Sequence, residues 1–369
     1  MRKTLTGLVT VALALTLVGC GSGDSKTTGV YANKGATIGI AMPTKTSPRW
    51  INDGNSMAQQ FKAMGYKVEL KYGDSSPSKP NDIPFQVKQV QTMVNNGDKL
   101  LVIGAIDGSS MSKVLASAAS KHIPVIAYDR LLTGTKNVNF QATFDNLRVG
   151  RMQAQLLLDR LHVSKGSGGH FNIELTAGSP TDANAHSFYN GSMAVLKPFL
   201  KTHQINVLSG ETGFTQIATV NYDGAIAGSR IKSIVSTFYQ TKPLDAVLSP
   251  YDGMSIGIIK ALKSVGYGTG TKKLPLTSGQ DAELPSIKSI IAGEQTFTIY
   301  KDTRELAKVA VQQGNALLTG DTAMVNDTTT FKNGVKTVPT YLLPPIEVDK
   351  TNYKTLLVDG GYYTAAQVS

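Results

Sequence analysis

Acidic, basic, amide and aromatic side chains gather directly after several predicted strands of this chain. The clusters are Lys45–Trp50, Asp129-Arg130, Asp145-Asn146, Pro180–His186, Tyr251-Asp252, Gln280-Asp281 and Lys301-Asp302. A carboxylate beside a guanidinium, with amides and further carboxylates opposite, forms hydrogen bonds with adjacent hydroxyl groups, and aromatic rings cover the weakly polar faces of a ring. That combination is typical of neutral-sugar recognition. A single Asp or Arg is more often a loop cap or part of a surface ion pair, so the prediction depends on the recurrence.

The elements that must position these clusters alternate between short apolar segments and amphipathic ones. Strands are predicted at Thr37–Met42, Lys67–Tyr72, Lys99–Ile103, Pro124–Tyr128, Asn139–Phe144, Phe171–Glu174, Asn206–Leu208, Ala246–Ser249, Leu274–Thr277 and Thr296–Ile299. Helices are predicted at Asn52–Met64, Ile83–Asn95, Ser110–Lys121, Arg148–Leu161, Ala185–Lys197, Gly224–Phe238, Ser255–Ser264, Leu284–Ala292 and Thr303–Leu318. Strands apolar on both faces lie between helix layers. The pattern predicts an α/β protein with two doubly wound parallel-sheet lobes, whose ligand lies beyond the carboxyl ends of the strands.

Five segments resemble the type I periplasmic binding proteins that deliver sugars to bacterial ABC transporters, in their xylose-binding and multiple-monosaccharide-binding branch. They are YDRLLTGTKNVNFQATFDNLRVG (128–150), NIELTAGSPTDANA (172–185), LDAVLSPYDGMSIGIIKAL (244–262), SGQDAELPSIKSIIAGEQTFTIYKDTRELA (278–307) and LVDGGYY (357–363). The resemblance spans the chain from about residue 37 to the end. It implies a monomeric binding protein that closes over a monosaccharide (an aldose such as glucose, galactose, arabinose or xylose), without catalysis, cofactor or metal.

Carried over residue by residue, the resemblance implies a set of ligand-binding side chains. They are Arg49, Trp50, Asp129 and Arg130 from the first lobe, Asp182, Asn184, His186, Tyr222 and Tyr251 from the second, and Asp281 and Lys301 near the hinge. Three of them depart from the family's pattern. Tyr222 stands where relatives often have a stacking tryptophan, Tyr251 where several have asparagine, and His186 where relatives vary. Direct contact of Tyr251 and His186 with the ligand therefore stays open.

The family fold also implies discontinuous lobes joined by three hinge strands. We expect residues 36–144 and 282–333 in the first lobe, and residues 145–281 and 334–369 in the second. The chain would then cross between lobes near Asp145, Asp281 and Asn333. Contacts to both lobes stabilise the closed form, which a permease subunit of the transporter can read.

The N-terminus predicts export. Residues 1–20 read MRKTLTGLVTVALALTLVGC, with two cations before an apolar run that is shorter than a membrane-spanning helix. The ending LVGC resembles the bacterial lipobox, so we expect cleavage before Cys20, acylation of its thiol and anchoring to the outer side of the cell membrane; an ordinary cleaved signal peptide is the alternative. Residues 21–35 then form a flexible, Gly/Ser-rich tether.

Composition and motifs bear on other functions. The 369-residue chain has a single cysteine, which excludes an internal disulfide framework and Cys-based zinc sites, and its net charge of +11 comes from scattered lysines and arginines, unlike a nucleic-acid-binding surface. No Gly-Lys dipeptide is present, which excludes a Walker A loop. The related lactose-repressor class begins with a DNA-binding helix-turn-helix, whereas this chain begins with a signal peptide.

One motif favours an enzyme. Gly253-Met254-Ser255-Ile256-Gly257 fits the G-x-S-x-G nucleophile elbow of α/β-hydrolases. In that fold the histidine follows the serine, but all five histidines of this chain precede Ser255, so we interpret Ser255 as a helix-start residue that satisfies backbone donors. A sensor that presents bound sugar to a chemoreceptor or a sensor kinase has the same lobes and pocket, and the sequence does not separate it from a transport protein.

Overall fold

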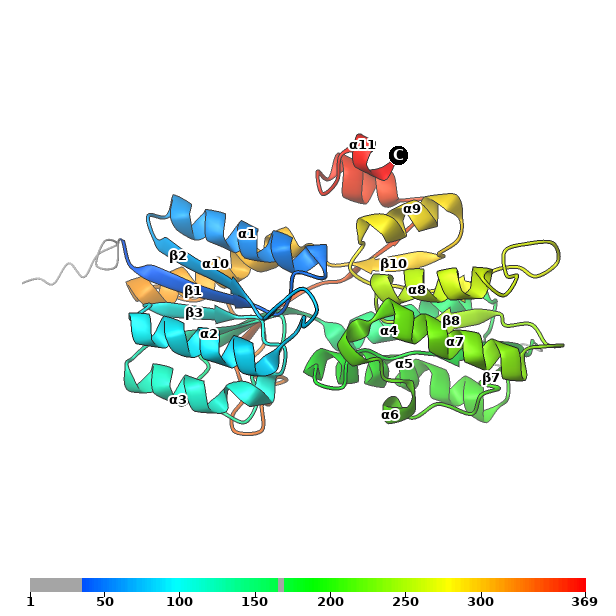
Figure 1. Cartoon of the computed structure of the whole chain (residues 1–369), viewed down its shortest axis with the longest axis horizontal. Helices are drawn as coiled ribbons and strands as arrows, with labels where there is room; N and C mark the ends of the chain where they lie inside the picture. The colour runs from blue at the N-terminus through cyan, green and yellow to red at the C-terminus, as the bar shows by residue number, and fades with distance from the viewer. Residues whose placement is uncertain (1–34, 165–168) are drawn as a thin grey trace, which may run out of the picture.

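The first lobe is built on a six-stranded parallel sheet (Figure 1). Its strands, in sheet order, are β11 (Thr340–Leu343), β5 (Phe140–Phe144), β4 (Val125–Tyr128), β3 (Leu100–Ile103), β1 (Thr37–Met42) and β2 (Lys67–Tyr72). Helices α1 (Pro48–Ala63) and α10 (Thr303–Thr319) pack on one face, and α2 (Ile83–Asn96), η1 (Gly108–Met111) and α3 (Ser112–Ser120) on the other. The computed structural model describes residues 35–164 and 169–369. The predicted signal peptide, Cys20 and all of the tether except Gly35 lie outside the described residues.

The second lobe has a four-stranded parallel sheet in the order β7 (Ile205–Asn206), β6 (Phe171–Leu175), β8 (Ala246–Leu248) and β9 (Leu276–Thr277). Around it lie α4 (Asn146–Arg160), α5 (Ala183–Lys201), α6 (Phe214–Ile217), η2 (Val220–Tyr222), α7 (Gly224–Phe238), α8 (Asp252–Lys263) and α9 (Leu284–Ala292). Helices α4 and α5 share the core on one face, and α7 and α8 form the core on the other. The prediction of two doubly wound parallel-sheet lobes is confirmed.

Helices α7 and α8 approach each other closely through glycines. A Cβ atom on Gly257 would lie 2.0 Å from the carbonyl oxygen of Gly224, and one on Gly228 would lie 2.5 Å from that of Gly257. Contacts this short leave room only for hydrogen, so each position requires glycine. Gly257 of the G-x-S-x-G motif therefore has a packing role, and Gly224 of α7 has one as well, since a Cβ on Gly224 would meet the Gly253 carbonyl oxygen at 2.4 Å.

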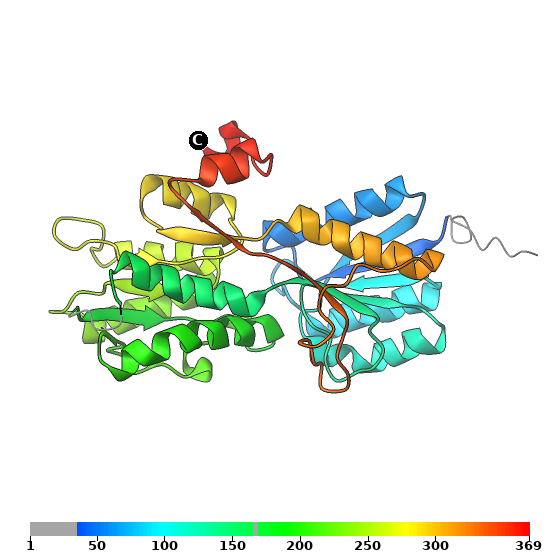
Figure 2. The same cartoon turned by 180° about the vertical axis from the view of Figure 1, so that it is seen from behind.

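The chain passes between the lobes three times (Figure 2), and two crossings differ from the predicted boundaries. The sequence predicts that residues 282–333 belong to the first lobe. Instead, α9 packs against α8, and β10 (Phe297–Tyr300) pairs antiparallel with β12 (Ile346–Asp349), while Phe297 and Ile299 lie in the core of the second lobe. The chain thus returns to the first lobe after β10, at Lys301, rather than at Asp281.

The third crossing also lies later than predicted. Residues from 334 onward are predicted in the second lobe, but β11 pairs in parallel with β5 of the first lobe. The chain crosses between β11 and β12, about ten residues beyond Asn333. It then ends in a π-helical turn (Lys354–Asp359) and α11 (Ala365–Val368), which pack on α9 (Figure 1). Among the described residues, no helix has the length and apolar character needed to cross a membrane.

Candidate ligand-binding site

A cavity of about 370 Å³ lies between the two lobes, at the carboxyl ends of their strands. Ten of the eleven predicted ligand-binding residues line it: Arg49, Trp50, Asp129, Arg130, Asp182, Asn184, Tyr222, Tyr251, Asp281 and Lys301. Further lining comes from neighbouring polar side chains, among them Thr44, Thr46, Ser47, Asn81, Ser179, Thr181, Asn221, Asp223, Gln280 and Glu283. Most of the lining is therefore able to donate or accept hydrogen bonds.

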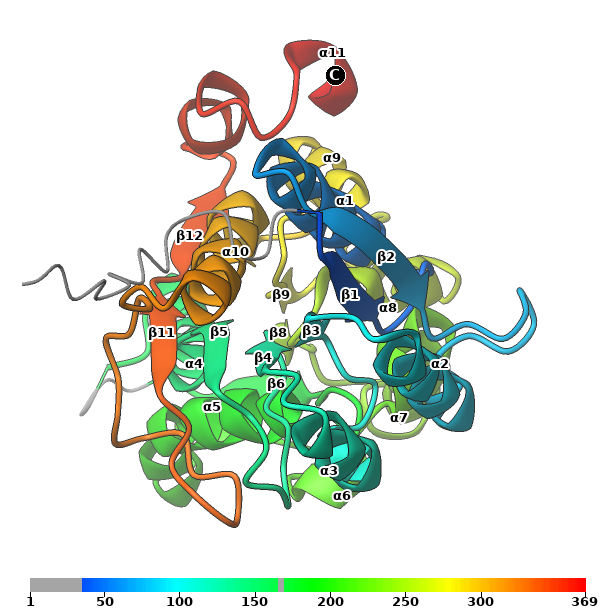
Figure 3. The same cartoon turned by 90° about the vertical axis from the view of Figure 1, so that its left-hand side faces the viewer.

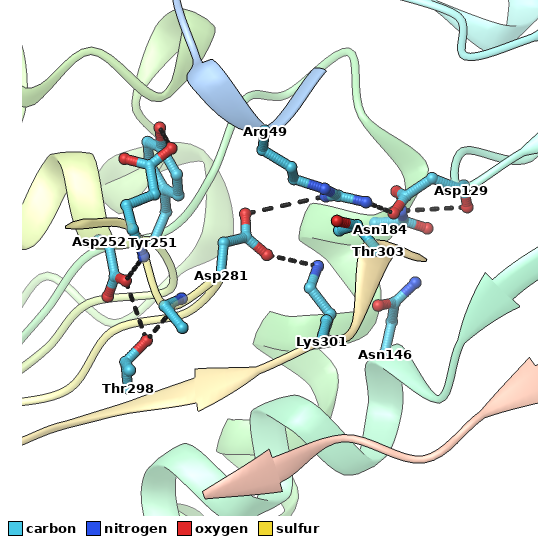
Figure 4. A network of polar contacts seen from close by, with 12 residues as sticks. Arg49, Asp129, Asn146, Asn184, Tyr251, Asp252, Asp281, Thr298, Lys301 and Thr303 are labelled. Atoms are coloured by element: carbon cyan, nitrogen blue, oxygen red, sulfur yellow. Dashed lines mark hydrogen bonds and ion pairs between the residues drawn. The ribbon is translucent and has the colours of Figure 1, made fainter. Parts of the chain in front are cut away.

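Arg49 is the centre of the first-lobe half of the site (Figure 4). It lies in the first turn of α1, 6% exposed, and its guanidinium forms an ion pair with Asp129 and a 3.4 Å contact with Asp53, one helical turn further along α1. Asp129 follows β4 with φ of +61°, a left-handed conformation that is unusual for a residue other than glycine. This turn directs the Asp129 carboxylate toward Arg49 instead of along the strand.

Burial and charge act in opposite directions on the two carboxylates beside Arg49. Burial raises the pKa of Asp53 to about 7, and the charge of Arg49 opposes this only in part. Burial also tends to raise the pKa of Asp129, but the cations Arg49 and Lys301 outweigh it and hold the pKa below its usual value. Asp129 is therefore a carboxylate that accepts hydrogen bonds at neutral pH.

The second lobe meets these groups through the start of α5. Asp182 is the N-cap of this helix and accepts a hydrogen bond from the backbone N–H of Asn184 at 2.9 Å. The Asn184 amide donates across the cleft to the Asp129 carboxylate at 2.7 Å, and Arg130 of the first lobe lies 3.1 Å from the Asp182 carboxylate. The lobes are thus in contact through polar groups, and the structure is a closed form.

The third ion pair of the cavity lies beside the hinge. Lys301, 1% exposed, contacts the Asp281 carboxylate at 2.8 Å, and Arg49 lies 3.8 Å from the same carboxylate (Figure 4). Asp281 and Ala282 have φ values of +91° and +51°. The fully buried Asp252 carboxylate stabilises this strained segment, since it accepts hydrogen bonds from the backbone N–H of Glu283 at 2.9 Å and from Thr298 at 3.0 Å.

Aromatic rings complete the cavity wall, and they belong to Trp50, Phe188, Tyr222 and Tyr251. Trp50 stacks with two cations, because the guanidinium carbons of Arg49 and Arg130 lie 4.3 Å and 5.2 Å from its ring centroid. Tyr222 and Tyr251 meet edge to face with centroids 5.7 Å apart, and the Tyr222 hydroxyl donates to Asp182 at 2.8 Å. The rings therefore give the cavity apolar surface, while the hydroxyl groups of Tyr222 and Tyr251 stay hydrogen-bonded to carboxylates.

His186 does not line the cavity, so this predicted site residue is wrong. It is exposed and stacks on Phe214, with ring centroids 4.0 Å apart. The reason is helical geometry, because two positions along an α-helix turn the side chain by about 200°. Asn184 in α5 faces the cleft, and His186 consequently faces away from it.

Sequence reasoning missed several acidic residues of the site, among them Asp53, which contacts Arg49, and Glu283, which lines the cavity. Asp53 lies four positions after Arg49, which is the spacing that brings helical side chains together. Glu283 lies two positions after Asp281 and precedes the Leu284-Pro285 start of a predicted helix, a position where polar side chains gather. Both signals are present in the sequence.

Ser255 does not have the environment of a nucleophile. Its side chain is fully buried in α8, and its hydroxyl lies 2.7 Å from the Ser278 carbonyl oxygen and 3.0 Å from that of Tyr251. Its hydroxyl therefore donates to a backbone carbonyl, with that of Ser278 the nearer, which corrects the prediction that it satisfies backbone donors. A buried hydroxyl used in this way joins α8 to the segment that carries Asp281.

Comparison with known proteins agrees with this geometry. The model of the periplasmic binding protein domain matches residues 38–322. The chain belongs to the periplasmic binding protein family. It is 54% identical over 337 residues to the multiple sugar-binding periplasmic receptor ChvE of Rhizobium radiobacter, covering 91% of this chain and 93% of that protein. It is 32% identical over 336 residues to the D-xylose-binding periplasmic protein of Escherichia coli, with 91% and 93% covered.

A solved structure adds a ligand to this comparison. The solute-binding protein of an ABC transporter from Clostridium phytofermentans, which contains bound β-D-glucose, is 40% identical and superposes with a TM-score of 0.85, covering 90% of this chain and all of that one. The two-lobed α/β fold of this periplasmic binding protein is therefore also that of an experimentally determined family member.

Proposed function

We propose that this periplasmic binding protein captures a monosaccharide between its lobes and delivers it to the permease of an ABC transporter. The observation that carries the proposal is the pairing of every cation in the cavity wall with a carboxylate: Arg49 with Asp129, Arg130 with Asp182, and Lys301 with Asp281. Because each cation of the wall is already paired with a carboxylate, the site offers no free positive charge to an anion and suits a neutral ligand with many hydroxyl groups. Binding, not catalysis, is the function we infer.

The ligand class is an aldose in the pyranose form. The polar groups come from all around the cavity, while Trp50, Tyr222 and Tyr251 supply apolar surface for the faces of a sugar ring. The relatives named above for multiple sugars and D-xylose, and the glucose-bound neighbour, support this class. We expect a Kd in the micromolar range or below, which corresponds to about −8 kcal/mol or better.

The test is a thermal-shift screen against aldoses, ketoses, disaccharides and nucleosides, followed by calorimetry on each hit. A ligand that binds only the folded protein raises the melting temperature. We expect a shift with D-glucose, D-galactose, L-arabinose or D-xylose. A shift with nucleosides and none with any monosaccharide would overturn the proposal.

The variant Arg130→Ala tests whether the sugar binds in this cavity. Arg130 contacts Asp182 of the other lobe and Trp50 of the cavity wall, so its removal should weaken binding more than it weakens the fold of either lobe. We expect at least a 30-fold loss of affinity for the best sugar, because hydrogen bonds to a charged group contribute about 2 kcal/mol or more. Unchanged affinity would show that the sugar binds elsewhere.

We also propose that the N-terminal segment exports the protein and that Cys20 carries the lipid anchor. This rests on the lipobox-like LVGC sequence at residues 17–20. Mass spectrometry of the mature protein is the test. Acyl groups on an N-terminal Cys20 support the anchor, whereas an unmodified N-terminus or a different cleavage site contradicts it.

A second candidate function is the presentation of bound sugar to a signalling partner. It is favoured by the name of the Rhizobium radiobacter relative, which is described as a receptor. A deletion strain separates the two functions: loss of sugar uptake supports transport, and loss of a sugar-induced response with uptake intact supports signalling.

A further inference from the structure

Glu283 links the two lobes at the edge of the cavity, through side chains that are outside the three ion pairs. One of its carboxylate oxygens accepts a hydrogen bond from the Ser47 hydroxyl at 2.8 Å and another from the Tyr251 hydroxyl at 2.7 Å. Ser47 belongs to the first lobe, at the start of α1, and Glu283 and Tyr251 belong to the second, at the starts of α9 and α8. A single oxygen atom thus connects three helices across the cleft.

All three residues are helix N-caps that make no capping bond with their side chains. This sets them apart from the aspartates Asp82, Asp145, Asp182, Asp223 and Asp302, each of which accepts a hydrogen bond from the first turn of its own helix. Serine is among the most effective N-cap residues, yet Ser47 donates across the cleft instead. Its hydroxyl therefore contributes to the contact between lobes and not to the stability of α1.

The surroundings favour these bonds at Glu283. The backbone N–H of Glu283 donates to the buried Asp252, so the Glu283 carboxylate projects from a fixed backbone position. Burial raises the pKa of Glu283, while the hydrogen bonds from Tyr251 and Ser47 lower it and the nearby Asp281 raises it further. The Tyr251 bond lies within the second lobe and persists when the lobes separate, whereas the Ser47 bond exists only when they are closed.

We propose that Ser47, Glu283 and Tyr251 form a latch that stabilises the closed lobes independently of the sugar. Glu283 is a positioning residue in this scheme: Tyr251 orients its carboxylate, and Ser47 engages it on closure. The inference deepens the proposed function, because a latch of this kind sets how long bound sugar is retained. A protein whose closed form is favoured before binding also has a higher apparent affinity, since less free energy is used for closure.

The test measures lobe closure without any ligand. The background is Cys20→Ser, which removes the only cysteine of the chain. Spin labels at Lys88→Cys on α2 and Lys232→Cys on α7 report the distance between lobes by double electron–electron resonance. Both positions are exposed, and α2 and α7 lie on the side of the molecule away from α10 and β12, near which the chain crosses, so their separation responds to opening (Figure 3).

Ser47→Ala is the decisive variant, with Ser56→Ala in the same helix as its matched control. The Ser56 hydroxyl accepts a bond from Gln60 within α1 and does not reach the second lobe. We expect Ser47→Ala to lower the closed-to-open ratio of the ligand-free protein about 5- to 10-fold, the size of one hydrogen bond, and to speed sugar release by a similar factor. Ser56→Ala should change neither.

Two further variants keep the test independent of a single substitution. Tyr251→Phe removes only the bond within the second lobe and should reduce closure less than Ser47→Ala does. Glu283→Gln retains an acceptor oxygen and should keep most of the closure, which separates the latch from a requirement for the charge.

Equal distance distributions for Ser47→Ala and Ser56→Ala in the ligand-free protein would overturn the latch. Faster sugar release with an unchanged ligand-free distribution would also overturn it, because Ser47 would then act on the sugar. If no monosaccharide binds the parent protein but Ser47→Ala still opens the lobes, the latch stands and the proposed sugar function fails.

Discussion

The two lobes supply polar groups to one cavity in different ways. In the first lobe, Arg49 contacts both Asp53 and Asp129 within the lobe, so this half of the site is formed before closure. In the second lobe, Asp182 and Glu283 lie at the starts of separate helices, and each meets a first-lobe side chain across the cleft. The difference suggests a division of roles: the first lobe provides a preorganised platform, and the second lobe completes the contacts on closing.

Arg49→Ala should have the largest effect, because it removes the centre of the preorganised half. Asp53 and Asp129 would remain buried without their cation, and we expect the free energy of unfolding to fall by about 3 to 5 kcal/mol. Urea denaturation followed by circular dichroism measures this loss. Arg49→Lys serves as the control, and it should recover only part of the stability because a single ammonium group does not reproduce the guanidinium fork.

If Arg49→Ala lowered the free energy of unfolding by less than about 1 kcal/mol, the interpretation of the first lobe as a preorganised platform would be contradicted. It would mean that the carboxylates relax into water once the cation is gone, so that the first-lobe half is no more preorganised than the second.

Gly257→Ala tests the second lobe in the same way. The added methyl group would meet the Gly224 carbonyl oxygen at 2.0 Å and force α7 and α8 apart, at a cost of about 3 kcal/mol. Because Gly224 and Asp223 line the cavity, sugar binding should weaken as well. Hydrogen exchange should show that the amides of α7 and α8 lose protection, while the protection of the first-lobe strands β1 to β5 is unchanged. An equal loss of protection in both lobes would mean that the lobes are not separate cooperative units.

The buried carboxylates give the comparison a pH dependence. The pKa of Asp53 is raised from 3.8 to about 7, so between about pH 4 and pH 7 the folded protein keeps a proton that the unfolded chain has released. Stability from this group therefore falls as the pH rises through that window. We expect Asp53→Asn to remove a stability difference of about 3 kcal/mol between pH 5 and pH 8, measured by urea denaturation.

Asp252 provides the matching measurement in the second lobe. Burial raises the pKa of Asp252 well above 3.8, so this group also makes the free energy of unfolding fall as the pH rises. Asp252→Asn should remove that contribution. The contradicting outcome concerns Asp53. If Asp53→Asn leaves the pH dependence of the free energy of unfolding unchanged, Asp53 is ionised throughout this pH range and its pairing with Arg49 outweighs burial.

Tyr222→Phe should have the smallest effect. It keeps the ring on the cavity wall and removes only the hydroxyl that donates to Asp182. We expect sugar affinity to fall about 5-fold, equivalent to about 1 kcal/mol, with the melting temperature of the ligand-free protein almost unchanged. Calorimetry with the best sugar from the screen measures this, and a loss near that of Arg130→Ala would mean that the hydroxyl binds the sugar directly.

Local patterns predicted the lobes and most of the cavity wall. β1 and β2 span the predicted residues without any shift, because each is a short segment with a clear boundary to the loop that follows it. The positions of Asp129 and Arg130 followed from their place directly after a buried strand, and family resemblance added Tyr222.

What local patterns missed depends on contacts between distant residues. β10 belongs to the second lobe because it pairs with β12, which follows almost fifty residues later, and nothing within either strand indicates this pairing. The role of Glu283 likewise depends on Ser47, which lies 236 positions earlier. The wrong prediction for His186 could have been avoided from the sequence alone. In a helix where Asn184 faces the cavity, a residue two positions later faces away from it.

The C-terminal segment constrains when each lobe can become complete during synthesis. The first-lobe sheet needs β11, and the second lobe needs β12 as well as Val368, which is buried against α9, while Lys288 donates to the carbonyl oxygen of Ser369. The first lobe is therefore not finished until β11 has been made, and the second not until β12 and α11 have been made. Folding of both lobes therefore depends on pairing between residues that lie far apart in the sequence, which is slower than the formation of local contacts.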